Sequence, residues 1–296
     1  MLSDPESADD EIIDEYRWNL LYRKKQELRI IAAFELFRLH GIEPVLIKGW
    51  AIGSYYPPSI CRTASDTDLA VHSYDHETAE AIRTSPEGRK LIIDLHNGVR
   101  RHDTVPFETL FERAETVTLG GTAIRILRPE DHLRVVVSHW LTDGAEYKDK
   151  LWDIYYMIQN RPENFDWDLC LKPVSKHRQR WIEAAAGLAS KYLGLELSET
   201  PFPNAADSLP EWLIECVERE WATELRLVPL DTLFRDPAQF IRQVKKRIPP
   251  NPIASVIDCD GDLYSERIAW SQTRSFFRRF IPSAAHAAHI FVSHGR

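Results

Sequence analysis

Apolar residues near the start of the chain recur at the period of a helix. Between Asp10 and His40 they are spaced mostly three and four residues apart, which is typical of a helix that buries one face. Gly41 follows directly, and glycine is the residue that most often ends a helix in the left-handed conformation. The pattern predicts one long helix that stops before Gly41. Residues 1–9 are polar and acidic, and we expect them to be disordered.

Shorter apolar runs between residues 45 and 127 predict a β-sheet with short helices between its strands. Two adjacent glycines between two of the strands are typical of a tight hairpin. The expected strands are Val45 to Ile47, Asp66 to Val71, Leu91 to Leu95, Thr116 to Leu119 and Thr122 to Leu127, with Gly120 and Gly121 in the hairpin turn. The expected helices between them cover Trp50 to Tyr56 and residues 75–84.

The pattern changes after Pro129, where the remaining segments have helical periodicity. Pro129 suits the first position of a helix, and acidic residues follow it where the helix dipole favours negative charge. Further helices are expected over residues 147–159, 176–193, 209–224 and 235–247, and a loop over residues 198–210. The sequence therefore predicts an α+β fold with two domains, an α/β domain over residues 1–128 and a mostly helical domain over residues 129–296.

Composition narrows the class of protein. The net charge of −8 and the isoelectric point of about 5.8 argue against non-specific DNA binding, which needs a basic surface. The four cysteines (Cys61, Cys170, Cys216 and Cys259) lack the spacing of a zinc site or of a disulfide framework. No apolar run reaches the ~20 residues that span a bilayer, and the acidic N-terminus is unlike a signal peptide. We expect a cytoplasmic protein without membrane association.

Two acidic residues stand two positions apart in the second expected strand. Residues i and i+2 of a strand point to the same face, so Asp66 and Asp68 are expected side by side, while Leu69 and Val71 face the core. Two adjacent carboxylates repel each other unless a cation compensates them. Mg²⁺ prefers oxygen ligands of this kind and usually keeps waters and phosphate oxygens in its shell. The pair predicts a magnesium site, and a solvated strand edge is the alternative.

A third carboxylate, Asp94, interrupts the apolar third strand. A carboxylate in such a run needs a partner, because burying it alone is unfavourable. If the two strands are neighbours, Asp94 joins Asp66 and Asp68, and three carboxylates can hold two magnesium ions. Asp94 is then the best candidate for helping to remove the proton of the hydroxyl group that accepts the transferred group. The alternative is a strand-end residue bonded to backbone amides.

The first expected strand runs into Lys48 and Gly49, and Arg62 follows in the loop before the acidic pair. Glycine lets the backbone approach a phosphate closely, and the N–H groups at the start of the next helix can donate to it. Lys48 and Arg62 bring positive charge to the same region. These residues are candidates for binding a triphosphate, and a surface ion pair is the alternative for Arg62.

Together these segments resemble the uncharacterised bacterial nucleotidyltransferase family within the DNA polymerase β-like superfamily. The resemblance covers about residues 25–160, roughly half of the chain. It rests on Leu46-Ile47-Lys48-Gly49, Arg62-Thr63-Ala64-Ser65-Asp66-Thr67-Asp68-Leu69 and Ile93-Asp94-Leu95-His96, and continues through Arg128-Pro129-Glu130-Asp131-His132 and Lys150-Leu151-Trp152-Asp153-Ile154.

The resemblance implies a mixed sheet and the transfer of a nucleoside monophosphate from a nucleoside triphosphate, with ATP as the first candidate, and release of pyrophosphate. It implies catalytic and metal-binding roles for Asp66, Asp68 and Asp94 with two Mg²⁺ ions, and nucleotide contacts for Lys48, Gly49, Arg62, Ser65 and Lys150. The acceptor, a hydroxyl or phosphate on a small molecule, a protein or an RNA, is not identified by the sequence.

Two departures from the family pattern keep other functions open. Trp50 follows Gly49, where the superfamily usually has a small residue, and only 25 residues separate Asp68 from Asp94, where the family usually has a longer insert. One alternative is a degenerate member that binds a nucleotide or a partner protein without chemistry. Another is an AMPylating component of a toxin–antitoxin pair. His96 is interpreted here as a structural histidine, and a role in the site is the alternative.

Overall fold

The computed structural model describes residues 5–99, 102–223, 225, 236–265 and 268–278 of the 296-residue chain. The chain divides into two compact units. The first unit holds Met1–Val136 with Tyr156–Val174, and the second holds Val137–Tyr155 with Ser175–Arg296. The sequence places the boundary at residue 128, whereas the units divide inside helices α4 (Pro129–Thr142) and α5 (Leu151–Gln159), each of which has its two ends in different units.

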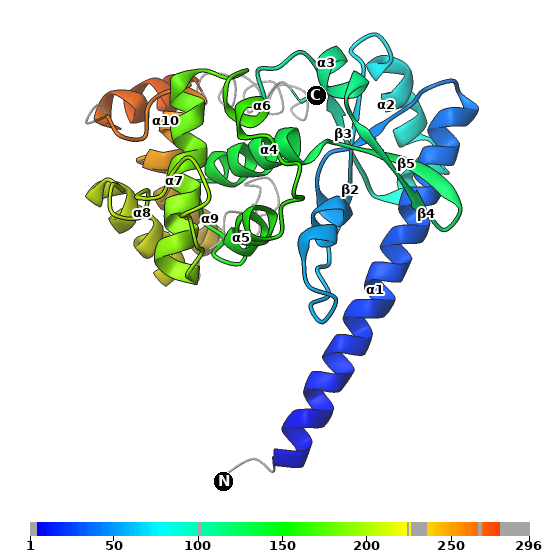
Figure 1. Cartoon of the computed structure of the whole chain (residues 1–296), viewed down its shortest axis with the longest axis horizontal. Helices are drawn as coiled ribbons and strands as arrows, with labels where there is room; N and C mark the ends of the chain where they lie inside the picture. The colour runs from blue at the N-terminus through cyan, green and yellow to red at the C-terminus, as the bar shows by residue number, and fades with distance from the viewer. Residues whose placement is uncertain (1–4, 100–101, 224, 226–235, 266–267, 279–296) are drawn as a thin grey trace. The chain divides into compact units, whose positions relative to one another are not determined.

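Helix α1 (Pro5–Leu39) opens the first unit and ends where the sequence predicts (Figure 1). Gly41 has φ +76°, and its N–H donates to the carbonyl oxygen of Arg38, as in other helices that end at a glycine. The expected disorder over residues 1–9 differs from the structure at residues 5–9, which are helical. Proline suits the first helical position, so the helix begins at Pro5 rather than after the acidic segment.

Five strands form one mixed sheet in the order β3-β2-β1-β5-β4. Their bounds are β1 Val45–Leu46, β2 Thr67–Val71, β3 Ile93–Asn97, β4 Glu115–Leu119 and β5 Thr122–Ile126. β1 pairs antiparallel with β2 and parallel with β5, β2 pairs parallel with β3, and β4 pairs antiparallel with β5. The chain is therefore α+β with a mixed sheet, as the sequence predicts.

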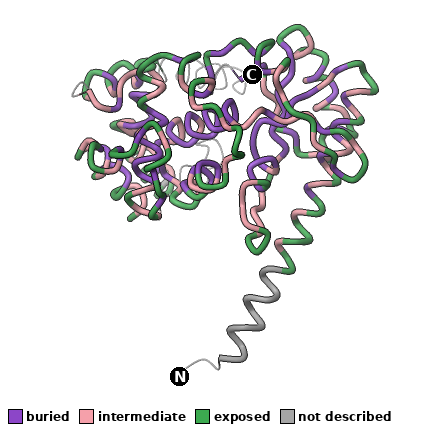
Figure 2. The backbone as a smooth tube through the Cα atoms, viewed as in Figure 1, coloured by how far each residue is buried: buried purple, intermediate pink, exposed green. Residues whose placement is uncertain are grey.

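Side chains alternate along the strands between two apolar clusters, one on each face of the sheet. Leu46, Leu69 and Val71 pack in one cluster with α1 and α2 (His76–Thr84). Val45 and Ala70 pack in the other with α3 (Phe107–Glu112) and the first part of α4. All of β2 is buried (Figure 2), which explains why apolar residues follow one another in Leu69-Ala70-Val71 without polar alternation.

The predicted hairpin between β4 and β5 is confirmed. Leu119 pairs with Thr122, and Gly120 and Gly121 in the turn have φ +57° and +88°. Positive φ at both central residues gives a turn whose twist matches that of the flanking strands, and glycine adopts it without a Cβ clash.

Strands β2 and β3 begin later than the sequence predicts. Asp66 precedes β2, which starts at Thr67. Before β3, residues Gly88–Leu91 form a 3-10 turn, η2, and Ile92 after it has φ +51°. A left-handed residue cannot be part of an extended strand, so β3 starts at Ile93 rather than at Leu91. The pattern of apolar residues could not predict the first residues of β2 and β3, because these depend on backbone conformation and on strand pairing.

The elements that the structure describes after β5 are helices, as the sequence predicts. α4, α5, α7 (Lys176–Leu193), α8 (Glu211–Ala222) and α9 (Pro237–Arg247) match the expected helical segments, and residues 198–210 contain no helix or strand. The sequence does not predict two shorter helices, α6 (Trp167–Leu171) and α10 (Pro252–Asp258). The side chains of Asp166 and Asn251 cap their N-termini, a signal that is visible in the sequence only when the helix itself is expected.

The four cysteines are free thiols, so none forms a disulfide. Within the described part of the chain, the helices are too short or too polar to cross a membrane.

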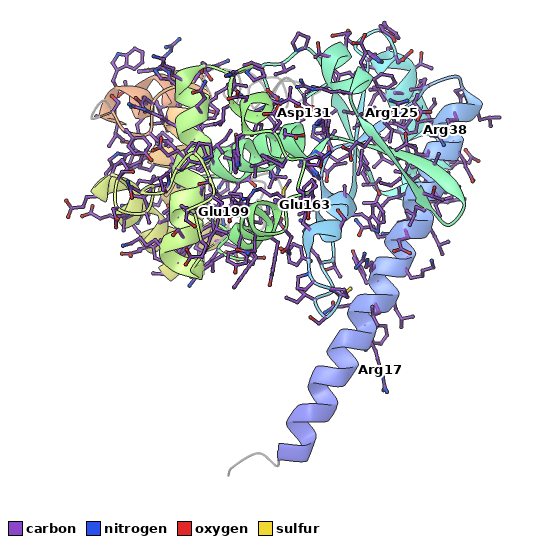
Figure 3. The ribbon with its side chains drawn as sticks, viewed as in Figure 1. Arg17, Arg38, Arg125, Asp131, Glu163 and Glu199 are labelled. Atoms are coloured by element: carbon purple, nitrogen blue, oxygen red, sulfur yellow. The ribbon has the colours of Figure 1, made fainter. Side chains whose placement is uncertain are left out.

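A buried ion-pair network holds the loop after β3 against α4. Arg134 on α4 donates to Asp103 and pairs with Asp131, which also accepts hydrogen bonds from Arg113. Asp131, labelled in Figure 3, lies near the start of α4, and both aspartate side chains are fully buried. Asp103 also accepts the backbone N–H groups of the two residues that follow it. The network therefore fixes the loop that leaves β3.

We predict that Arg134→Met lowers the free energy of unfolding by on the order of 3–5 kcal/mol, because Asp103 loses its cation and Asp131 loses one of two inside the fold. Urea denaturation followed by circular dichroism measures it. Lys172→Met is the control, since its ion pair with Asp168 is exposed and should contribute little. Similar losses of stability in both variants would contradict the prediction.

Candidate metal and nucleotide site

Asp68 and Asp94 lie opposite each other on neighbouring strands. The parallel register of β2 and β3 pairs Asp68 with Asp94 and Ala70 with His96. Because strand residues alternate between the two faces, both acids and His96 belong to the face on which Ala70 packs with α3 and α4. β2 and β3 are therefore neighbours, as a metal site shared by the two carboxylates requires.

The three polar side chains on this face converge. One ligand atom each from Asp68, Asp94 and His96 lies within 4.8 Å of the other two. The Nε2 atom of His96 is 3.1 Å from Oδ2 of Asp94 and 3.5 Å from Oδ1 of Asp68. Sequence reasoning interpreted His96 as structural and missed this position between two carboxylates. The available signal was its i, i+2 spacing from Asp94 in one strand, which puts both side chains on one face.

Lys48 forms a buried ion pair with Asp68. The Nζ atom of Lys48 is 2.8 Å from Oδ1 of Asp68, and the two side chains are only 9% and 8% exposed. Burial alone would raise the pKa of Asp68, but His96 and Lys48 outweigh it and hold that pKa well below its usual range. Asp68 is therefore ionised at neutral pH. The positive charge of Lys48, which the sequence assigned to a triphosphate, is paired with this carboxylate.

Asp94 is half exposed, with 51% of its side chain accessible, because β3 is an edge strand. The argument that Asp94 is buried in an apolar run is therefore incorrect, although the residue does have a charged partner. The neighbouring His96 lowers the pKa of Asp94. Burial alone would lower the pKa of His96, but Asp68 and Asp94 together raise it above its ordinary value of 6.5. His96 and the two carboxylates thus favour one another's charged forms, whereas the charge of Asp68 opposes the ionisation of Asp94.

Gly49 stands where the chain turns from β1 into η1 (Gly49–Tyr55), a 3-10 helix that replaces the expected short helix from Trp50. Its φ is +64°, and a Cβ at this position would lie 3.5 Å from Oδ2 of Asp68. A guanidinium N–H of Arg62 donates to the carbonyl oxygen of Gly49 over 2.9 Å. Arg62 therefore braces the turn, and glycine permits its left-handed conformation.

Ser65 and Asp66 lie in the bend that leads into β2. The Ser65 hydroxyl donates to Oδ1 of Asp66 over 3.2 Å, and Gln26 on α1 donates to the backbone carbonyl of Asp66 over 3.1 Å. Because Asp66 precedes the strand, the i, i+2 argument does not place it beside Asp68. The group formed by Asp68, Asp94 and His96 includes no atom of Asp66.

Lys150 belongs to the second unit. Its Nζ atom is 3.0 Å from Oδ2 of Asp143 and 4.7 Å from the centre of the Tyr147 ring. The neighbouring Lys148 lies 5.3 Å from the centre of the Trp221 ring. Both lysines thus have partners within their own unit, and the nucleotide contact expected of Lys150 stays a prediction.

Comparisons with known proteins do not identify a family. No protein-family model matches the chain, and neither does any curated protein or solved structure.

The donor set of this site fits a divalent cation. The carboxylate oxygens of Asp68 and Asp94 are ligands that Mg²⁺ and Mn²⁺ prefer. The Nε2 atom of His96 is buried and has no hydrogen-bond partner within the described structure, despite its short distances to both carboxylates. Buried polar atoms are rarely left in this condition. A cation held between the two acids would satisfy it, and the described residues supply one such group rather than ligands for two ions.

In the metal-free protein, we predict that the pKa of His96 lies above 6.5 and falls in Asp94→Asn, because an amide stabilises the imidazolium less than a carboxylate does. Imidazole ¹H–¹⁵N NMR titrations in EDTA measure both proteins. An unchanged titration of His96 would mean that the two side chains do not interact.

Proposed function

We propose that this chain is a divalent-metal-dependent nucleotidyltransferase of the DNA polymerase β-like superfamily. It would transfer a nucleoside monophosphate from a nucleoside triphosphate, with ATP as the first candidate, to an acceptor hydroxyl or phosphate. The observation that carries the proposal is the pairing of Asp68 with Asp94 across two parallel strands, beside the turn formed by Lys48 and Gly49. These residues occur in the order of the family motifs that the sequence resembles.

The charge of the site explains why a metal belongs to the proposal. Two ionised carboxylates repel an anionic triphosphate, so Asp68 and Asp94 can bind a nucleotide only through a cation. A bound divalent cation would neutralise the phosphate charge and favour ionisation of the acceptor hydroxyl. Asp68 and Asp94 would hold it, and Asp66, which lies next to β2, is the candidate for a further ligand.

Other residues of the chain prepare the site for a triphosphate. Lys48 and His96 keep Asp68 ionised, and hence able to act as a ligand. Gly49 leaves the position beside Oδ2 of Asp68 without a side chain, and Arg62 holds the backbone of the turn through the Gly49 carbonyl. In the proposed function these contacts would position the cation and the phosphates.

In the proposed reaction, an oxygen of the acceptor attacks the α-phosphorus and forms a new P–O bond. The bond from the α-phosphorus to the oxygen that bridges to the β-phosphorus breaks, and pyrophosphate leaves with that oxygen. The proton of an acceptor hydroxyl passes to Asp94 or to water. Since the lowered pKa of Asp94 makes it a weak base, its main contribution would be to hold the cation and orient the acceptor.

One observation favours a second function, a nucleotide-binding module without chemistry. The ammonium of Lys48 lies 2.8 Å from Oδ1 of Asp68 and already neutralises part of the charge that would attract a metal. If this pair persists with nucleotide bound, Asp68 has fewer oxygens for coordination. The two functions differ in metal dependence and in pyrophosphate release.

We predict that Asp68→Ala weakens binding of Mg·ATP and abolishes turnover, because the residue holds the cation in ground and transition states. Asp94→Asn keeps the size of the side chain and should lower turnover by about two orders of magnitude, with a smaller effect on binding. Pyrophosphate release is measured with each nucleoside triphosphate and a cell extract as the source of acceptor, and Mg·ATP binding is measured by calorimetry.

Asp75→Asn is the matched control for charge removal. Asp75 follows β2, and its side chain forms no capping hydrogen bond with α2. It should leave both measurements unchanged. Near wild-type turnover in Asp94→Asn would show that Asp94 is not a catalytic residue. If the wild-type protein binds Mg·ATP but releases no pyrophosphate with any nucleoside triphosphate, the binding module becomes the better account.

A further inference from the structure

Among the described residues, His96 brings a ring nitrogen, Nε2, close to both acids of the site. It is buried, it lies 3.1 Å from Asp94 Oδ2 and 3.5 Å from Asp68 Oδ1, and neither contact has the geometry of a hydrogen bond. A nitrogen that lies between the oxygens of two carboxylates is positioned as a third ligand would be. The other two ligands are the carboxylate oxygens themselves.

The backbone fixes the direction of the His96 ring. His96 is paired with Ala70 in the parallel register and follows Asp94 by two residues on the same face. The buried ring of His102 contacts it, with the two ring centres 6.2 Å apart and the planes at 63°. A ring confined by a strand and a neighbouring side chain has little freedom to turn Nε2 away from the acids.

From these observations we propose that His96 coordinates the metal through Nε2, and that this ligand makes the site prefer Mn²⁺ to Mg²⁺. The inference deepens the proposed function and rests on the metal site that the proposal assigns to Asp68 and Asp94. It changes the ligand set from three carboxylates to two carboxylates and one imidazole.

Ligand chemistry gives the direction of this preference. Mg²⁺ is a hard ion that takes oxygen ligands and keeps its waters, whereas first-row transition metals accept imidazole. Mn²⁺ is the member of that series that also suits carboxylate and phosphate oxygens. Lys48 adds to the effect, because its ammonium offsets part of the carboxylate charge that would bind Mg²⁺. Coordination by the His96 nitrogen then accounts for a larger share of the affinity of the site for a metal ion.

The experiment uses the full chain, stripped of metal with EDTA and desalted, with MnCl₂ as the probe and no nucleotide. Loss of the free Mn²⁺ signal in electron paramagnetic resonance gives the affinity, and competition with MgCl₂ gives the selectivity. Electron spin echo modulation of bound Mn²⁺ detects a coordinated ¹⁴N directly. We expect ¹⁴N modulation in the wild type, and in His96→Gln its loss with an affinity for Mn²⁺ lower by about tenfold or more.

Two further variants test whether the nitrogen ligand is His96. His102→Gln removes the neighbouring ring but no ligand, and should retain the ¹⁴N modulation. His96→Asp restores an oxygen ligand, and should bind Mn²⁺ without ¹⁴N modulation and with a smaller preference over Mg²⁺. Mn²⁺ bound by the wild type without ¹⁴N modulation, or modulation that persists in His96→Gln, would overturn the inference. So would the absence of Mn²⁺ binding by the wild type.

Failure of this inference differs from failure of the proposed function. The protein could release pyrophosphate with Mg²⁺ while its bound Mn²⁺ has no ¹⁴N ligand. This result would support the proposed nucleotidyltransferase activity and show that His96 is not a metal ligand. Conversely, ¹⁴N-coordinated Mn²⁺ in a protein that releases no pyrophosphate from any nucleoside triphosphate would support the ligand set and contradict the reaction.

Discussion

The parallel pairing of β2 with β3 is the constraint on which the rest of the site depends. Its register sets Asp68 opposite Asp94 and Ala70 opposite His96, so one face of two strands carries all three polar groups. A slip of one residue would turn Asp94 and His96 to the opposite face. The apolar clusters on the two faces oppose such a slip, because Leu69 and Val71 are buried on one side and Ala70 on the other.

Because this register holds the two carboxylates close together, their negative charge must be compensated. The chain provides two cationic groups for this. Lys48 supplies a buried ammonium to Asp68, and the His96 ring lies between both acids. The turn at Gly49 brings Lys48 to this position, and Arg62 braces it. Part of the charge of the two carboxylates is therefore neutralised by groups of the chain itself. In the proposed function, a metal ion would compete with Lys48 for Asp68, so its affinity would depend on the position of this lysine.

Sequence reasoning found the elements and the acids, and it could not find their pairing. The apolar runs and the residues that stop them predicted the sheet strands, the hairpin at Gly120 and the end of α1, because these signals are local. The role of His96 and the partner of Lys48 depend on register, which a single sequence does not contain. Asp66 falls outside the converging group, because β2 begins only at Thr67. The left-handed Ile92, which delays β3, is likewise unusual for a β-branched residue.

The central claim is that Asp68 and Asp94 bind a nucleoside triphosphate through a divalent cation. A crystal structure with Mn²⁺ and a non-hydrolysable ATP analogue, with anomalous scattering recorded for the metal, tests it most directly. The account predicts a manganese peak about 2.0–2.5 Å from a carboxylate oxygen of each acid, with the phosphates of the analogue against the turn at Gly49. A nucleotide bound elsewhere, or a manganese peak away from both carboxylates, would contradict it.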